Sequence, residues 1–379
     1  MVGIVSERYA FVAQWLDPAS EITWKFQVFW YPDTSEAEMY DIKNRRKLLH
    51  RTRLPELKTA DFYLGNTVCI YSRQLHLLEY GDTFTADRLS AKQEKTLAMI
   101  KPDALQSFGS ILAAVEAAGF TVGRLRMCHL TLADAEGFYA VHAGRPFFGP
   151  LTAFMSSGRI VAMELLAPGA IRKWRQLLGP TNTATARQEA PNSLRARFGS
   201  DNTRNACHGS DATETAAQEA AFFFKQPVGR CCTTTNTSLA LIKPHAVRSH
   251  RMGEIVQALQ QQFDITAAEM FTLDAVNAGE FLEVYRGVLP SAEYSGLLDE
   301  LTSGSFLALE VSSRDGSSPV EPLRQLCGPA DPDMAKILRP GSLRALYGLN
   351  KVQNAIHCTD LQEDGDLETK YFFDIMQSS

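Results

Sequence analysis

The sequence contains no apolar run that approaches the length of a membrane span, and its net charge is small. Its 379 residues carry 38 lysines and arginines against 43 aspartates and glutamates, a formal net charge of −5. A transmembrane helix needs roughly 20 consecutive apolar residues. A slightly acidic chain is also not attracted as a whole to nucleic acid or to an anionic membrane. We therefore predict no membrane partner and no nucleic-acid partner.

Signatures of metal-binding, nucleotide-loop and secreted proteins are also missing. The seven cysteines form no C-x-x-C pair and no zinc-ligand spacing with histidine. Neither a Walker A loop nor a G-x-G-x-x-G loop is present, so a P-loop or Rossmann site is not supported. The first ten residues contain Glu7 and Arg8 within an apolar run that is too short for a signal peptide. We therefore expect a reduced, cytoplasmic protein.

One seven-residue pattern occurs twice. Asn205-Ala-Cys-His-Gly-Ser-Asp211 is matched downstream by Asn354-Ala-Ile-His-Cys-Thr-Asp360. Each copy is preceded by its own Ile-Lys-Pro, at residues 100–102 and 242–244. A repeated Lys…His frame of this length is too long for a solenoid unit and indicates a duplicated domain.

Residues 1–91 differ in texture from the rest of the chain. Short runs alternate apolar with polar residues and are divided by turn signals such as Asp17-Pro18 and Pro32-Asp33. This pattern is typical of a small β-rich module. A basic run from Asp41 to Arg53 lies between two of the expected strands. It is either a solvated hairpin or a docking surface for an acidic partner.

From residue 92 the pattern becomes β-α-β-α-β. Expected strands cover residues 96–100, 122–130 and 160–166, with helical periodicity between them. The stretch 226–238, with its proline, glycine and threonines, is expected to be a linker, and the same order restarts after it. We predict an α+β protein with a β-rich module at 1–91, a ferredoxin-like α/β sandwich at 92–225 and a second one at 239–379.

His208 is the candidate nucleophile of the first copy. The same domain also offers Lys101, Arg175 and Arg195. A neutral imidazole among fixed cations suits a polyanion, and phosphoryl transfer depends on positioning and on stabilising oxygen charge. A lone histidine is more often structural than catalytic. The inference therefore depends on the recurrence of these residues in the second copy.

Both copies resemble nucleoside diphosphate kinases. The resemblance rests on Asn-x-x-His-Gly-Ser-Asp at 205–211, with Ile-Lys-Pro-Asp at 100–103 and Arg-Pro-Phe-Phe at 145–148. The first 91 residues are similar to the axonemal DM-type domain, through Met39-Tyr-Asp-Ile-Lys-Asn-Arg45, Leu48-Leu-His-Arg51 and the stretch from Asp61 to Thr85. The order of the three parts resembles a multi-domain axonemal member of the kinase family. Together the resemblances cover nearly the whole chain.

The resemblance implies a role for each matching residue of the first copy. His208 would take the γ-phosphate of a nucleoside triphosphate as a phosphohistidine and pass it to a nucleoside diphosphate. Mg²⁺ would bridge the nucleotide phosphates, with no protein residue expected as a metal ligand. The residues implied in catalysis are His208, Ser210, Glu219, Lys101 and Tyr139. Those implied in nucleotide binding are Lys101, Phe147, Arg175, Thr181, Arg195 and Asn205, with Phe147 stacking on the base.

The second copy matches the same pattern incompletely. Its matching residues are Lys243, Tyr285, Arg324, Arg344, Asn354, His357, Thr359 and Glu368. Ala330 stands for the phosphate-binding threonine, Glu293 for the base-stacking phenylalanine and Cys358 for the glycine after the histidine. A carboxylate near a triphosphate repels it. We therefore expect a degenerate second site, in a domain that packs with the first as an internal pseudo-dimer.

The N-terminal resemblance implies a place and partners rather than chemistry. It implies a pleckstrin-homology-like β fold, contacts with tubulin and other axonemal doublet-microtubule proteins, and location in the cytoskeleton of the cilium or flagellum. Three functions are compatible with the sequence. They are a doublet-microtubule protein whose first kinase domain is active, a purely structural axonemal scaffold with little catalysis, and a cytosolic kinase regulated by its β module.

Overall fold

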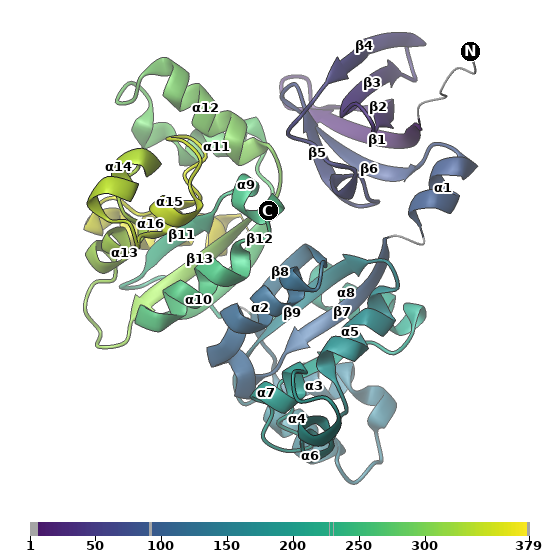
Figure 1. The fold of residues 1–379 in the computed structure, drawn as a ribbon, viewed down its shortest axis with the longest axis vertical. Helices are drawn as coiled ribbons and strands as arrows, with labels where there is room; N and C mark the ends of the chain where they lie inside the picture. The colour runs from purple at the N-terminus through teal and green to yellow at the C-terminus, as the bar shows by residue number, and fades with distance from the viewer. Residues whose placement is uncertain (1–6, 91–92, 227, 230, 377–379) are drawn as a thin grey trace. The chain divides into compact units, whose positions relative to one another are not determined.

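The computed structural model describes residues 7–90, 93–226, 228–229 and 231–376 (Figure 1). The expected boundary at 91–92 and Pro227 of the expected linker lie outside these residues. The chain forms two compact units, one of Met1–Glu94 with Thr272–Ser305, the other of Lys95–Phe271 with Phe306–Ser379. Segment 272–305, from the second predicted kinase domain, thus groups with the β-rich module. No helix in the described residues combines the length and apolar character of a membrane span.

The first unit is built on a six-stranded antiparallel sheet in the order β4-β3-β2-β1-β6-β5. Phe26, Val28 and Trp30 of β2 are all buried, because alternate residues of a strand face the same side of a sheet. They share a core with Phe11 and Phe62, which confirms the expected β-rich module. The strands are β1 Tyr9–Asp17, β2 Ile22–Tyr31, β3 Glu36–Asp41, β4 Arg46–Arg53, β5 Thr67–Ile70 and β6 Arg73–Tyr80.

The basic run forms the β3–β4 hairpin. Asp41 Oδ1 accepts a hydrogen bond of 2.9 Å from the backbone N–H of Asn44 and so closes the turn. Arg45 takes a positive φ of 53° at the turn. Residues 42–47 are exposed, although Lys47 pairs with Glu38 at 2.6 Å. The hairpin therefore presents its remaining cations to solvent.

Helices complete the first unit. Asp82 caps α1 by accepting from the Thr85 N–H at 2.7 Å, and Thr85 Oγ1 accepts from the Ala10 N–H of β1 at 2.8 Å. Gln74 on β6 donates to the carbonyl of Thr302 at 3.1 Å, which ties the end of α12 to the sheet. The short helices are η1 Thr59–Asp61 and η4 Glu283–Tyr285, and the α-helices are α1 Thr83–Leu89, α11 Ala275–Phe281 and α12 Ser291–Thr302.

The second unit contains an eight-stranded sheet in the order β10-β7-β9-β8-β12-β13-β11-β14. Its strands are β7 Glu94–Ile100, β8 Thr121–His129, β9 Arg159–Ala167, β10 Cys207–Gly209, β11 Ser238–Ile242, β12 Phe263–Phe271, β13 Phe306–Ser313 and β14 Ile356–Cys358. Read outward from its centre, the sheet repeats one order, β8-β9-β7-β10 and β12-β13-β11-β14. This is the layout expected of two copies of one ferredoxin-like domain.

Helices cover this sheet in matching positions in the two copies. In the first copy they are η2 Pro102–Ser107, α2 Phe108–Ala117, α3 Leu132–Phe138, η3 Ala140–His142, α4 Phe148–Met155, α5 Ala170–Leu178, α6 Thr183–Glu189, α7 Leu194–Phe198 and α8 Thr213–Lys225. In the second copy they are α9 Pro244–Arg248, α10 Met252–Gln262, α13 Val320–Cys327, α14 Pro332–Leu338, α15 Leu343–Tyr347, η5 Gln362–Asp364, α16 Gly365–Lys370 and the π-helical turn η6 Tyr371–Ile375.

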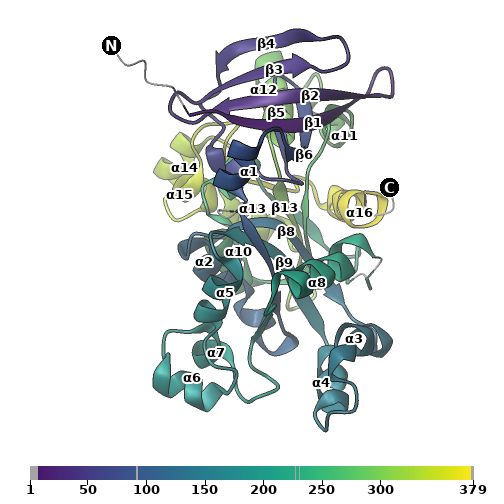
Figure 2. The same ribbon diagram turned by 90° about the vertical axis from the view of Figure 1, so that its right-hand side faces the viewer.

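The two copies meet along the strands β8 and β12 and the helices α2 and α10, which lie side by side in both views (Figures 1 and 2). Arg126 of β8 donates to Glu269 of β12 at 2.6 and 2.8 Å. A Cβ added to Gly109 of α2 would lie 2.3 Å from the backbone N of Gln257. The helix backbones therefore approach as closely as glycine permits.

The two helices also cap each other's first turns. Glu116 of α2 accepts from the N–H groups of Met252 and Gly253 at 3.1 and 2.8 Å. In return, Gln260 of α10 accepts from the Gly109 N–H at 2.8 Å. Burial raises the pKa of Glu116 to about 7, because a carboxylate loses hydration inside the protein. Each helix thus caps the first turn of the other, but of the two capping side chains only Glu116 can carry a charge.

The described part of the expected linker is bound to both copies. The Cys231 thiol donates to the Met127 carbonyl of β8 at 3.3 Å. Thr233 donates from its N–H and its hydroxyl to Glu310 Oε1 of β13 at 2.8 and 2.6 Å. The segment therefore packs against the sheet over these residues.

Candidate active site

His208 lies in the middle of the short strand β10. It faces Met99 in the antiparallel pairing of β10 with β7. Two residues earlier, Ala206 has a φ of +67°, a left-handed conformation that is strained for a residue with a Cβ. The strain is offset by a hydrogen bond of 3.0 Å from its N–H to Asp103 Oδ2. Ala355 has a φ of +70° at the matching position of the second copy.

A carboxylate and a hydroxyl orient the imidazole. His208 Nε2 is 3.1 Å from Glu219 Oε1 on α8. The Ser210 hydroxyl donates to the other oxygen of Glu219 at 2.6 Å and accepts from the Leu97 N–H at 3.3 Å. With Nε2 donating to the carboxylate, the lone pair of Nδ1 stays available. The structure thus brings together His208, Ser210 and Glu219 as the sequence predicts.

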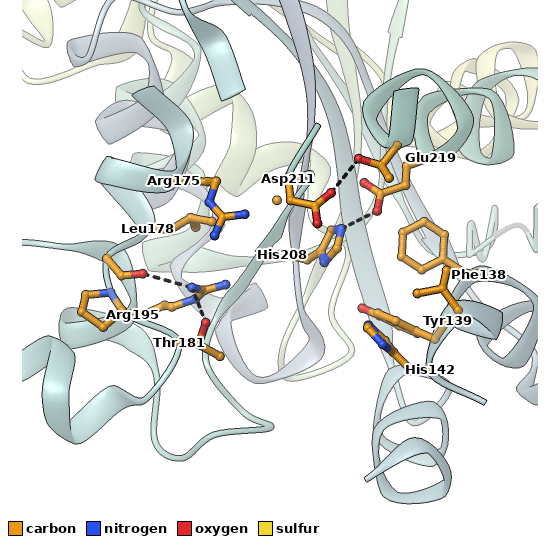
Figure 3. Close-up of a pocket in the computed structure, with 15 residues that line it drawn as sticks. Phe138, Tyr139, His142, Arg175, Leu178, Thr181, Arg195, His208, Asp211 and Glu219 are labelled. Carbon is orange, nitrogen blue, oxygen red and sulfur yellow. Dashed lines mark hydrogen bonds and ion pairs between the residues drawn. The ribbon is translucent and has the colours of Figure 1, made fainter. Parts of the chain in front are cut away.

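Aromatic side chains enclose the imidazole on one side (Figure 3). The rings of Phe138 and Tyr139 lie edge-on to His208, with centroids 5.5 and 6.0 Å away. Burial raises the pKa of the Tyr139 phenol above its ordinary value. The Tyr139 hydroxyl is buried and has no hydrogen-bond partner in the described residues. Such an unpaired donor is rare in a folded protein and suits a polar ligand.

Cations and a hydroxyl lie on the other side of the imidazole. Arg195 Nη1 donates to Thr181 Oγ1 at 3.3 Å and to the Gly179 carbonyl at 3.0 Å, and its Nη2 donates to the Cys207 carbonyl at 3.2 Å. Arg175 of α5 points toward the same space (Figure 3). These contacts hold Arg195 in place without a carboxylate, so its charge is available to an anion.

Lys101 is a further cation, close enough to Arg195 to be repelled by it. Its Nζ donates to Asn205 Oδ1 at 2.7 Å and to the Thr203 carbonyl at 3.1 Å. Burial, and then repulsion by Arg195, lower the pKa of Lys101 to about 8. A cation that is buried without a carboxylate in contact is stabilised by a bound anion.

These groups surround a pocket of about 470 Å³. Its lining includes Tyr139, Arg175, Thr181, Arg195, His208 and Glu219 from the predicted set. The other predicted residues, Lys101, Ser210, Asn205 and Phe147, lie outside the lining, and Phe147 is half exposed beside His142, with ring centroids 5.5 Å apart.

Nine residues that line the pocket are absent from the predicted set, among them Phe138, His142 and Asp211. Asp211 accepts from Thr215 Oγ1 at 2.8 Å, and this hydrogen bond is the main cause that lowers its pKa. Asp211 ends the repeated motif, which could have singled it out. His142 belongs to no repeated motif and left no such signal.

The second copy keeps the orienting groups around its histidine. His357 Nε2 is 3.2 Å from Glu368 Oε2, and Thr359 donates to the same oxygen at 2.8 Å. Lys243 donates to the Val352 carbonyl at 2.8 Å. Burial lowers the pKa of His357, but the nearby Glu368 carboxylate outweighs it, so the net shift is upward. The protonated imidazole, which has no free lone pair, is thereby favoured.

The rest of the second site departs from the first. Ala330 has no hydroxyl, and its carbonyl accepts from Asn354 Nδ2 at 2.9 Å. Arg344 instead donates from Nη2 to the sulfur of Cys358 at 3.6 Å, and Arg324 lies 3.8 Å from Glu321. The two remaining predicted positions, Tyr285 and Glu293, lie in segment 272–305 of the first unit.

The described residues contain no protein ligand set for a metal. Within the described residues, no three His, Cys, Asp or Glu side chains converge closely enough to hold a metal ion. The first pocket offers arginines that suit phosphate oxygens and the single carboxylate pair of Asp211 and Glu219. A metal that enters with a nucleotide would therefore be held mainly by the nucleotide's phosphates.

Comparison with known proteins agrees with this geometry. The family model described as nucleoside diphosphate kinase matches residues 94–228 and again residues 236–377. The nucleoside diphosphate kinase homolog 7 of Rattus norvegicus is 45% identical over 378 residues, 98% of this chain and 94% of that protein. The nucleoside diphosphate kinase of Desulfovibrio desulfuricans is 51% identical over 133 residues, 35% of this chain and 94% of that protein. This chain therefore belongs to the nucleoside diphosphate kinase family, as a multi-domain member that carries two copies of the kinase domain.

Proposed function

We propose that the first copy transfers the γ-phosphate of a nucleoside triphosphate to a nucleoside diphosphate through His208. The observation that carries this proposal is the 3.1 Å contact between His208 Nε2 and Glu219. It leaves Nδ1 of the same ring available beside a pocket that contains Arg175 and Arg195. Imidazole suits the task because a neutral nitrogen attacks at neutral pH and the resulting N–P bond stays reactive.

The reaction has two balanced half-steps. Nδ1 of His208 attacks the γ-phosphorus, an N–P bond forms, and the bond from phosphorus to the β,γ-bridging oxygen breaks, releasing the nucleoside diphosphate. A terminal β-phosphate oxygen of a different nucleoside diphosphate then attacks the phosphohistidine, which restores the imidazole. Glu219 keeps the proton on Nε2 and stabilises the positive charge that develops on the ring.

Binding would divide between phosphates, sugar and base. Arg175, Thr181 and Arg195 lie where phosphate oxygens would be held, and the buried pair of Lys101 and Asn205 would serve the phosphate and the sugar hydroxyls. Phe147, half exposed at the edge of the site, would stack on the base and accept any base, because stacking does not read base edges. Enzymes of this family use a divalent metal. We propose Mg²⁺, which would neutralise charge on the phosphates.

The second copy contributes little catalysis in this proposal. Its clamp lacks the hydroxyl of Thr181, its arginine contacts a sulfur, and the pKa of its histidine is raised. Its contacts with the first copy through β12 and α10 support a structural role as an internal pseudo-dimer. We propose tandem domains at 92–225 and 239–379 on this basis.

Steady-state exchange tests the enzyme proposal. The full chain is given ATP and a different nucleoside diphosphate, and formation of the new triphosphate is followed. We expect His208→Asn to lower the rate by about 10⁴-fold or more, because it removes the nucleophile. The matched variant His357→Asn is expected to change it less than about twofold. Equal losses in the two variants, or no loss in His208→Asn, would contradict the assignment.

The first 91 residues suggest a second, compatible function. We propose that this module has a pleckstrin-homology-like fold and attaches the chain to an acidic surface of the ciliary doublet microtubule, with tubulin or its associated proteins as partners. The exposed cations of the β3–β4 hairpin favour this function, because they would be attracted to an acidic polypeptide. The module's sheet, with α1 following it, supports the fold. The chain would then reside in the axonemal cytoskeleton.

Extraction of demembranated axonemes tests the attachment. We expect the full chain to resist mild salt and the double variant Arg45→Glu with Arg46→Glu to be released, because charge reversal turns attraction into repulsion. Release of both chains by detergent alone would favour the cytosolic kinase with a regulatory β module. An active axonemal protein and a purely structural one would both keep the His208→Asn chain in the axoneme. The exchange rate of the unaltered chain therefore decides between these two functions.

A further inference from the structure

Three matched positions differ together between the two copies. In the first copy Trp174, Leu178 and Gly209 pack around the strand that carries the histidine. A Cβ added to Gly209 would lie 2.4 Å from Trp174 Cδ1 and 3.0 Å from Leu178 Cδ1. That position has no room for a side chain.

In the second copy the same positions hold Leu323, Cys327 and Cys358. Cys327 precedes Gly328-Pro329 as Leu178 precedes Gly179-Pro180, and Cys358 follows His357 as Gly209 follows His208. Leu323 has a smaller side chain than the tryptophan at the matching position. The two thiols lie at the end of α13 and at the end of β14.

The two thiols are in direct contact and lie beside a cation. A hydrogen bond between the sulfurs is the largest influence on the pKa of each: it raises the pKa of Cys327 and lowers that of Cys358. Arg344 Nη2 donates to the sulfur of Cys358 at 3.6 Å. Both side chains are buried. A thiol donor, a sulfur acceptor and a guanidinium together stabilise a thiolate at Cys358.

We propose that Cys327 and Cys358 form a reversible intrachain disulfide when the protein meets a hydroperoxide. The Cys358 thiolate attacks one peroxide oxygen, the O–O bond breaks, and Cys358 becomes a sulfenic acid while water leaves. The sulfur of Cys327 then attacks the sulfenic sulfur, the S–O bond breaks, and a second water leaves. Two thiols and one hydrogen peroxide give one disulfide and two waters.

The disulfide would change the second site in two ways. It would join the end of α13 covalently to β14, the strand that carries His357. It would also withdraw the thiolate that accepts from Arg344 Nη2, the guanidinium at the position of the first copy's phosphate clamp. The pair is thus a modification site of the second copy, and it is independent of whether the first copy transfers phosphate.

Peptide mapping of the oxidised full chain tests the proposal. The reduced protein is treated with hydrogen peroxide, denatured in excess N-ethylmaleimide and digested without reductant. We expect a cross-linked peptide joining Cys327 to Cys358, a mass lower by two hydrogens, and recovery of both thiols after dithiothreitol. Three results would each overturn the proposal. They are alkylation of both cysteines with no link between them, stable sulfinic acid at Cys358, and preferential linkage of either cysteine to another one.

Matched variants sharpen the result. Cys327→Ser should abolish the link and leave Cys358 to over-oxidise, because the resolving thiol is missing. Cys231→Ser, in a thiol that contacts the Met127 carbonyl instead, should leave the Cys327–Cys358 link unchanged. If Cys327→Ser fails to fold, the mapping of the unaltered chain still decides, since it needs no variant.

Discussion

The two kinase copies place their histidines almost identically and surround them differently. The distances from Nε2 to the carboxylate are 3.1 Å for His208 and 3.2 Å for His357, and a hydroxyl bonds the same carboxylate in each. Around this common centre, the first copy has Thr181 on its clamp arginine, whereas the second has the sulfur of Cys358. The oriented imidazole is therefore common to both copies. The partners of the nearby arginine, Arg195 or Arg344, distinguish them.

Apart from removal of His208 itself, the largest expected effect comes from placing a residue of the second copy into the first. In Gly209→Cys the new Cβ would lie 2.4 Å from Trp174 and would displace the strand that carries His208. We expect exchange activity to fall by about 100-fold, since small misplacements of a catalytic group have effects of this size. The measurement is kcat for nucleotide exchange in the full chain.

Two further variants check the cause of that loss. Cys358→Gly, the reverse change in the second copy, should leave exchange activity unaltered. Adding Trp174→Leu to Gly209→Cys should recover part of the thermal stability, because it removes the clash. Full activity in Gly209→Cys alone would show that the packing difference between the copies does not matter.

The second effect concerns the close helix contact between the copies. In Gly109→Ala the new Cβ would lie 2.3 Å from the facing backbone, and in Gly253→Ala it would lie 2.1 Å from it. We expect each to lower the free energy of unfolding by about 1–3 kcal/mol, because overpacking against backbone forces the helices apart. Urea unfolding measures this change.

Gly149→Ala is the control for the helix contact. Gly149 lies within α4, and an added Cβ meets nothing within 4 Å. Alanine should therefore be neutral or stabilise by about 0.5–1 kcal/mol through helix propensity. Equal destabilisation by all three substitutions would mean that the contact between the copies is not tight.

The third effect is a pH dependence carried by Lys101. Its pKa of about 8 means that the side chain is charged below that pH and neutral above it. Because the charged form would bind phosphate, kcat/KM should fall as pH rises through 8, by about tenfold at one pH unit above the pKa. Lys101→Arg should show no such fall, since guanidinium stays protonated. Lys243→Arg should show the same pH profile as the unaltered chain. A flat pH profile in the unaltered chain would contradict the role of Lys101.

The smallest expected effect compares the two reciprocal caps. Glu116→Ala leaves two helix N–H groups without these partners, and Gln260→Ala leaves one N–H group and the Leu105 carbonyl without theirs. We expect losses of about 1–2 kcal/mol and about 1 kcal/mol in the free energy of unfolding at pH 5. The raised pKa of Glu116 favours the folded state at acid pH, and this contribution is lost as pH rises from about 4.5 through 7. The gap between the variants should therefore narrow at pH 8.

The repeated motifs predicted the features that the two copies share. Features that depend on contacts between distant residues became visible only in the structure. The Lys…His frame predicted two matching domains, and the resemblance to the kinase family implied that Ser210 and Glu219 orient His208. His142 was missed because no histidine recurs in the second copy, where Tyr285 ends the matching short helix η4. The contact at Gly109 was missed because a helical glycine in one sequence gives no sign of which backbone approaches it.

The division of the chain into units was also beyond the sequence. The hydrogen bond from Gln74 to the Thr302 carbonyl joins residues far apart in the chain, and no local pattern encodes such a pairing. The alternation of strands and helices placed segment 272–305 in the second kinase domain, and the family model's match to residues 236–377 includes it. Packing nevertheless groups the segment with the β-rich module. Propensity and periodicity describe elements, whereas their grouping depends on complementary surfaces.

Mapping of phosphohistidine in the full chain tests the central claim most directly. The unaltered protein is mixed with ATP, quenched in base and digested, and the phosphate on each histidine is measured by mass spectrometry. We expect phosphate on His208, its loss on addition of a nucleoside diphosphate, and none on His357. Phosphate on His357 at a level equal to that on His208, or on neither histidine, would contradict the account.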